Sequence, residues 1–137
     1  SKSKISASLP GGALNAINDN ELPLNSNDQD LLNYNCWPKT NSTEWIQYDF
    51  GKATSVSEAS VYWFDDGPWG GCRVPKSWRI LYKSGNSWKP VKVKGEYPTK
   101  KDALNSVKFE TVKTKAVRLE FVMPLDFSAG LYEWSVK

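Results

Sequence analysis

The chain has 137 residues, a formal net charge of +3 and no histidine, which excludes a Ser-His-Asp triad, a Cys-His dyad and a histidine-ligated metal. Its length suits one domain, and we expect residues 1–137 to be a single module excised from a longer multidomain protein. Seven Trp, six Tyr and five Phe indicate a packed β core and a surface that binds through aromatic side chains.

Short stretches of alternating apolar and polar residues recur along the chain and predict β-strands. Ile46, Tyr48 and Phe50 should share one face, and Gly51-Lys52 should then turn the chain. The strands are expected at residues 44–50, 56–64, 78–83, 87–93, 104–110, 115–122 and 131–136. Because no window has sustained helical periodicity, the expected fold class is all-β: a two-sheet antiparallel β-sandwich of the jelly-roll type, with about eight short strands.

The tryptophans on predicted strands are expected in the core, and so are the cysteines. Cys36 and Cys72 could form a disulfide if the protein is exported, but a domain of this size does not need one, so free buried thiols are favoured, with Cys72 beneath a loop. Tyr132, Trp134 and Val136 alternate with polar residues and should share one face. The four expected core tryptophans are Trp63, Trp78, Trp88 and Trp134.

The first candidate site lies in residues 15–35, a long segment rich in Asn, Asp and Leu with little strand pattern. Calcium takes about six to eight hard oxygen ligands, and this segment carries Asp19, Glu21, Ser26 and Asp28. A jelly roll brings its first and last strands together, so Glu133 could complete such a site. The alternative is a solvated polar loop held by Asx-turns.

The second candidate site is the loop at residues 65–71, which carries one indole and two carboxylates and is followed closely by a guanidinium. Sugar sites stack an indole on the apolar face of the ring and bind hydroxyls through carboxylates and guanidinium groups. Trp69 lies between Pro68 and Gly70 and has no evident place in a core, so it is the first candidate for contact with a ligand. The expected sugar-binding residues are Tyr34, Trp37, Asp65, Asp66, Trp69 and Arg73.

These polar residues also have structural interpretations. Asp65 could cap the turn, and Arg73 could be the structural partner of Asp65 or Asp66. Glycosidases use two carboxylates about 5–10 Å apart, but neighbouring residues on extended chain point in opposite directions. We therefore expect no intrinsic enzyme activity.

Four motifs in order along the chain resemble discoidin-like domains, the coagulation-factor C-type sandwich with a galactose-binding-like fold. Residues 45–51 (WIQYDFG) resemble the family's W-x-x-[IV]-D-[LF]-G strand, and residues 78–88 resemble its central hairpin. Residues 16–20 resemble the turn that opens the first long loop, and residues 130–134 the terminal strand. The chain is similar to family 32 carbohydrate-binding modules attached to bacterial glycoside hydrolases, including those of the β-L-arabinofuranosidase type.

This resemblance implies a structural calcium ion. In many such modules the matching Asp and the C-terminal Glu bind calcium, and here those residues are Asp19 and Glu133. Backbone carbonyls near Ala16 and Asn20 and a hydroxyl near Ser26 would complete the set, with Asn20 standing where glycine is usual.

The resemblance also implies a function: a non-catalytic carbohydrate-binding module that targets an attached glycoside hydrolase to glycans. The alternatives are a structural accessory domain that packs against the hydrolase without a ligand of its own, and a protein- or lipid-binding discoidin domain. The expected partners are a glycan and a catalytic domain in the same chain. With three arginines, nucleic acid is not expected, nor is a membrane. We expect a monomer that is periplasmic, secreted or on the cell surface.

Overall fold

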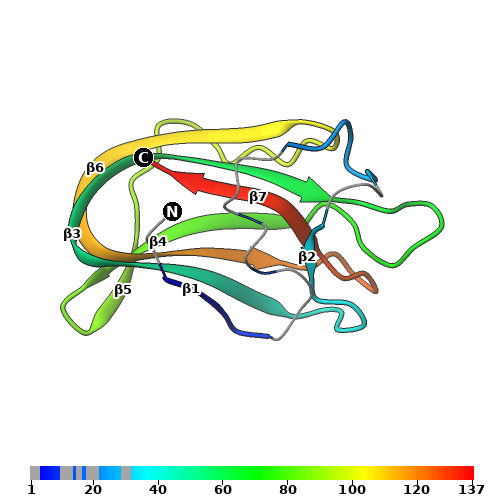
Figure 1. The fold of residues 1–137 in the computed structure, drawn as a ribbon, viewed down its shortest axis with the longest axis horizontal. Coiled ribbons are helices and arrows are strands. Elements are labelled where there is room, and N and C mark those ends of the chain that lie inside the picture. The colour runs from blue at the N-terminus through cyan, green and yellow to red at the C-terminus, as the bar shows by residue number, and fades with distance from the viewer. Residues whose placement is uncertain (1–3, 10–13, 15–16, 18–21, 29–31) are drawn as a thin grey trace.

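The computed structural model describes residues 4–9, 14, 17, 22–28 and 32–137, and these form an all-β fold without an α-helix (Figure 1). Its strands are β1 (Lys4–Ala7), β2 (Tyr34–Asn35), β3 (Thr43–Phe64), β4 (Ser77–Ser84), β5 (Ser87–Pro90), β6 (Leu104–Val122) and β7 (Gly130–Val136). No helix in the described part of the chain is long and apolar enough to cross a membrane. The predicted fold class, an antiparallel β-sandwich, is confirmed.

Two long bent strands, β3 and β6, build both layers of the sandwich. Residues 43–49 of β3 pair with residues 116–122 of β6, and β1, β4 and β5 extend this layer. Residues 59–64 of β3 pair with β7, residues 58–62 pair with the first part of β6, and β2 joins at the edge of β7. Figure 1 shows β3 and β6 curving together at one end of the molecule, so one continuous sheet folds over into two layers.

The prediction of separate strands at residues 44–50 and 56–64, and at 104–110 and 115–122, is wrong because each pair is one strand. Gly51 adopts a φ of 81°, and the β3–β6 register shifts between Asp49 and Thr54 and again between Val56 and Glu58. Such irregularities bend a paired strand and strengthen its twist without reversing it. The expected turn at Gly51-Lys52 is therefore a bend.

Aromatic side chains fill the space between the two layers. Trp63 meets Trp78 and Phe121 of the opposite layer edge to face, with ring centroids 5.9 Å apart in both pairs. Tyr48 stacks on Trp134 at 4.1 Å. Trp63, Trp78 and Trp134 are at most 2% exposed, which confirms their prediction as core residues.

Trp88 is a correction, because it lies outside the core. It belongs to the edge strand β5, where Arg118 lies between the rings of Trp88 and Trp45, 4.1 and 3.9 Å from their centroids. A tryptophan that stacks on a cation can stay half-buried on an outer face without a place in the core.

The predicted shared face of Tyr132 and Trp134 is also wrong. The register between β3 and β7 shifts between Tyr62 and Trp63: they pair with Glu133 and Leu131, which leaves Tyr132 as the unpaired bulge residue of β7. Tyr132 instead packs edge to face on Tyr62 and Phe64, in a second buried cluster that also contains Cys72. This cluster supports the loop between β3 and β4.

Candidate functional site

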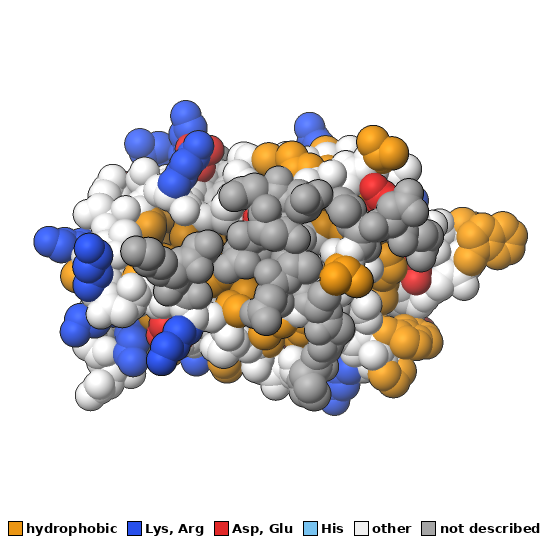
Figure 2. Space-filling view, in the orientation of Figure 1, with side chains coloured by type: hydrophobic (Ala, Val, Ile, Leu, Met, Phe, Trp, Pro, Cys, Tyr) orange, Lys and Arg blue, Asp and Glu red, His pale blue; other side chains and the backbone are white. Residues whose placement is uncertain are grey.

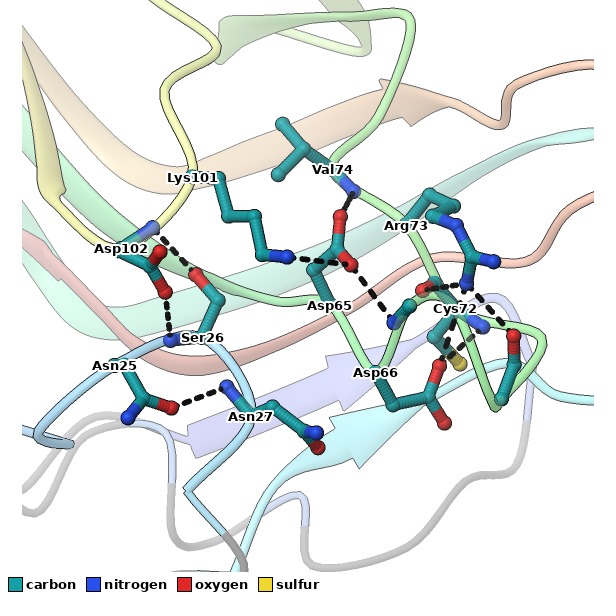
Figure 3. Close-up of polar contacts among 12 residues, drawn as sticks. Asn25, Ser26, Asn27, Asp65, Asp66, Cys72, Arg73, Val74, Lys101 and Asp102 are labelled. Atoms are coloured by element: carbon teal, nitrogen blue, oxygen red, sulfur yellow. Dashed lines mark hydrogen bonds and ion pairs between the residues drawn. The ribbon is translucent and has the colours of Figure 1, made fainter.

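The loop between β3 and β4, residues 65–76, is tied together by Asp65 (Figure 3). Its Oδ1 accepts a hydrogen bond from the Gly67 N–H at 3.0 Å, and its Oδ2 accepts one from the Val74 N–H at 3.1 Å. Lys101 Nζ lies 3.6 Å from Oδ1, and the residue is only 6% exposed. Asp65 is therefore a loop cap, and its assignment as a sugar-binding residue is corrected.

Arg73 likewise serves the loop. Its Nη1 donates to the carbonyl oxygens of Gly70 at 2.7 Å and Cys72 at 2.8 Å and lies 3.6 Å from Asp66 Oδ1 (Figure 3). The guanidinium also covers the ring of Phe127, 4.3 Å from its centroid. Arg73 thus has one of the structural partners considered for it, Asp66, and its contact with a ligand remains a prediction.

Beside this loop lies a hollow of about 450 Å³, which we call the indole hollow. Trp69 and Trp37 line it from two different loops and are 90% and 56% exposed. Asp66 also lines it, with its Oδ1 held by the Cys72 N–H at 2.8 Å. The full lining is Asn35, Trp37, Phe64, Asp66, Trp69, Gly70, Gly71 and Cys72. The structure thus brings together three of the residues predicted to bind sugar, namely Trp37, Asp66 and Trp69.

Two glycines set the geometry of this hollow. A Cβ on Gly71 would lie 1.9 Å from Cζ3 of Trp37, and a Cβ on Gly70 would lie 1.8 Å from Oδ2 of Asp66. Both distances are far below van der Waals contact, so the indole and the carboxylate rest directly on glycine backbone. Any larger residue at these positions must displace them.

Tyr34 does not line the hollow, and its prediction as a wall is wrong. It is fully buried, and its hydroxyl donates to the Leu9 carbonyl oxygen at 2.7 Å. Successive residues of a strand point to opposite faces, so the next residue of β2, Asn35, reaches the hollow instead. Sequence reasoning missed Asn35 and Phe64 as lining residues of the hollow. Had Tyr34 been assigned to the core, strand alternation would have predicted that Asn35 faces outward.

The described part of the predicted calcium set is engaged in other contacts. Ser26 is fully buried: its N–H donates to Asp102 Oδ1 at 2.6 Å and its hydroxyl accepts from the Asp102 N–H at 2.7 Å (Figure 3). Asp28 Oδ2 accepts from the Leu24 N–H at 2.9 Å. The described residues contain no group of three or more His, Cys, Asp or Glu placed to hold a metal. Ala16, Asp19, Asn20 and Glu21 lie outside the described residues.

Glu133 on β7 is buried at 4% exposure. Burial first, and the negative charge of Glu133 second, raise the pKa of Tyr48. Tyr48 donates its hydroxyl proton to the Trp134 carbonyl oxygen. Glu133, the residue that follows the bulge in β7, thus holds its carboxylate away from solvent, where a charge is costly unless it is compensated.

Both cysteines are free and buried, as predicted. Burial raises the pKa of the Cys36 thiol to about 11 and that of Cys72 to about 12. Both thiols are therefore protonated near neutral pH, whereas the thiolate is the reactive form. Cys72 packs beneath the loop, where it forms part of the floor of the indole hollow.

Comparison with solved structures gives several relatives of this fold. A chain of the Streptococcus pneumoniae β-galactosidase BgaA is 22% identical with a TM-score of 0.81, covering 98% of this chain and 91% of that chain. The Clostridium perfringens module CpGH89CBM32-5, in complex with GalNAc-β-1,3-galactose, is 16% identical with a TM-score of 0.70, covering 98% and 94%. Chitosan-binding module 1 of a Paenibacillus sp. IK-5 chitosanase/glucanase is 14% identical with a TM-score of 0.64, covering 98% and 94%.

At these identities the likeness establishes the fold. The comparison with curated proteins found no significant match. The family model of the F5/8 type C domain matches residues 2–130, which is nearly the whole chain. The chain therefore belongs to the F5/8 type C, or discoidin-like, domain family.

Proposed function

We propose that this domain is a non-catalytic carbohydrate-binding module and that the indole hollow holds a sugar. One observation carries the proposal: two indoles exposed by 90% and 56% line a single hollow together with a carboxylate. Exposed aromatic groups that gather around a hollow mark a binding surface. A volume of about 450 Å³ suits a small ligand such as one or two sugar rings.

The chemistry of the lining fits a sugar. An indole stacks on the apolar C–H face of a ring, while a carboxylate accepts hydrogen bonds from its hydroxyls. Asp66 is about a quarter exposed and its Oδ1 is already bound to the Cys72 N–H, so its carboxylate is held in place before a ligand arrives. Such preorganisation lowers the entropic cost of binding. Trp37 and Trp69 would be the walls and Asp66 the hydroxyl acceptor.

The relatives support a glycan ligand and an attached enzyme. One was solved with GalNAc-β-1,3-galactose, another is a chitosan-binding module of a chitosanase/glucanase, and a third belongs to a β-galactosidase. We propose that this domain likewise holds an attached glycoside hydrolase near its substrate by raising the effective concentration. Because such glycans lie outside the cytoplasm, we also propose that the domain works in the periplasm, outside the cell or on its surface.

The test is binding of the isolated domain to an array of glycans, followed by calorimetry with the best ligand. Trp69→Ala should weaken binding about tenfold, since the exposed indole contributes stacking but must be immobilised on binding. Trp88→Ala is the matched control, because it removes an indole from the outer face of β5 and should leave affinity unchanged. Equal affinity of Trp69→Ala and wild type would refute the site.

The proposal includes a structural calcium ion near Glu133. Calcium prefers carboxylate and carbonyl oxygens, and Glu133 supplies a carboxylate on the last strand, β7. Glu133 would hold the ion together with Asp19, carbonyls near Ala16 and Asn20, and Asp28. Bound there, calcium would tie the segment before β2 to β7 and stabilise the domain.

Calcium at 100 times its dissociation constant should raise the melting temperature of chelator-treated protein by about 10 °C. Differential scanning calorimetry with EDTA and then with CaCl₂ measures this shift. Glu133→Gln should abolish it, whereas Glu96→Gln, in the exposed loop after β5, should retain it. An unchanged melting temperature for the wild type on adding calcium would refute this part of the proposal.

A further inference from the structure

A second, larger hollow lies where β3 and β6 bend, and we call it the bend groove. Its volume is about 800 Å³, and its lining includes Lys4, Asp49, Lys83, Lys113 and Lys115. In Figure 1 the bend lies at the opposite end of the sandwich from the loop between β3 and β4. The bend groove therefore has no residue in common with the indole hollow.

The bend itself brings the four lysines of the groove together. Thr114 is 3% exposed, and its hydroxyl donates to the Lys83 carbonyl oxygen at 2.7 Å. Because side chains alternate along β6, burying Thr114 turns Lys113 and Lys115 outward. Lys4 of β1 joins from the next strand, where it is the register partner of Asp49. Three strands thus place positive charges around one hollow.

None of these lysines forms an ion pair with a carboxylate of the described residues. The ion pairs in the described part of the chain are Arg73–Asp66, Arg79–Glu120, Lys92–Glu110 and Lys101–Asp65, and none involves a lysine of the groove. Asp49 is the acidic residue in the lining, and both of its oxygens accept hydrogen bonds from Gln47 Nε2, at 3.2 and 3.0 Å. Like charges around one hollow repel and leave a positive potential that an anion would relieve.

The surface as a whole also has different side chains at its two ends. Figure 2 shows Lys and Arg side chains gathered at the end where the strands bend, and hydrophobic side chains gathered at the end that carries the loops. The chain's net charge is only +3, so four lysines around one groove are a local concentration of charge. The two ends of the domain thus suit ligands of different chemistry.

We propose that the bend groove binds a polysaccharide of acidic sugars through their carboxylates. The groove is open: at Gly51 and Gly85, which line it, an added Cβ would meet nothing within 4 Å. In a polysaccharide with one carboxylate per sugar ring, successive carboxylates can each form an ion pair with a different lysine. Duplex DNA carries about one charge per 1.7 Å, and its binding favours a surface with a higher density of positive charge and more arginine than these four lysines provide. This second site does not depend on what the indole hollow binds.

The probe is polygalacturonate, titrated into the isolated domain by calorimetry in 20 mM and in 300 mM salt. Wild type should bind at low salt, and screening should weaken the binding at high salt. Lys113→Gln/Lys115→Gln should lose affinity about tenfold. Lys94→Gln/Lys108→Gln is the matched control, because it removes the same charge from exposed positions outside the groove and should lose less than twofold.

Three further arms separate this site from its rivals. Trp69→Ala should bind polygalacturonate as wild type does, which distinguishes the bend groove from the indole hollow. Neutral dextran should not bind in the groove, and duplex DNA should bind more weakly than polygalacturonate. Equal losses in the two double variants, absence of polygalacturonate binding at low salt, or tighter binding of DNA would each overturn the proposal.

Discussion

Replacing Trp63 by alanine should lower the free energy of unfolding by about 4 kcal/mol. Trp63 is fully buried and packs from one layer onto Trp78 and Phe121 of the other. The two layers are joined through the bent strands β3 and β6, so they cannot close fully over the cavity that the missing indole leaves. A domain is stable by about 5–15 kcal/mol in total, so the loss should be large in urea unfolding followed by circular dichroism.

Two variants show whether this loss belongs to the core. Trp88→Ala removes the same side chain from edge strand β5, where it stacks on Arg118, and should cost only about 1 kcal/mol. Trp63→Phe should cost less than half as much as Trp63→Ala, because it fills most of the space and removes an indole N–H that has no partner among the described residues. Equal losses for Trp63→Ala and Trp88→Ala would contradict the assignment of the core.

The strand faces could be predicted because alternation is a local property. Ile46 and Tyr48 are buried on one face of β3, and Val117 and Leu119 on one face of β6, as their spacing indicated. The continuity of β3 through Gly51 could not be predicted in this way. It depends on the partner strand, where Ala116 pairs with Asp49 and Thr114 with Thr54 on either side of the bend. A glycine pattern alone does not distinguish a bend from a turn.

The candidate site was predicted in part, for a similar reason. Trp69 and Trp37 could be found from sequence, since an indole flanked by proline or glycine on a loop has no neighbours to bury it. The contacts of Asp65 and Arg73 with the loop backbone could not be predicted, because composition does not reveal which backbone groups of a loop need partners. Buried N–H and C=O groups must be satisfied, and here Asp65 and Arg73 satisfy them.

The family resemblance added what periodicity lacked, namely the family of the domain and the function that this family implies. Three of its four motifs lie within the segment that the F5/8 type C family model matches, residues 2–130, and the terminal motif begins at the end of that segment. It does not locate the bend groove, because that hollow arises where Lys83, Lys113 and Lys115 meet at a bend that sequence alone did not predict.

Gly71→Ala should weaken sugar binding about 30-fold, although it changes one hydrogen to a methyl group outside the proposed contacts with the sugar. The new Cβ would lie 1.9 Å from Cζ3 of Trp37, so the indole has to leave its position against the loop backbone. Trp37 is more enclosed than Trp69, at 56% against 90% exposure, and loses less freedom when a ligand binds. Displacing it should therefore cost more affinity than truncating Trp69.

A double-mutant cycle tests whether Gly71→Ala acts through the indole. Trp37→Ala alone should also lose about 30-fold in affinity, and adding Gly71→Ala to it should lose no more, because the three atoms nearest to the new methyl group all belong to the Trp37 indole. Calorimetry with the best ligand from the array measures all four proteins, and urea unfolding should show each to be folded. If the two losses instead multiplied in the double variant, Gly71 would act on the loop itself, and Trp37 would not be the wall that this glycine sets in place.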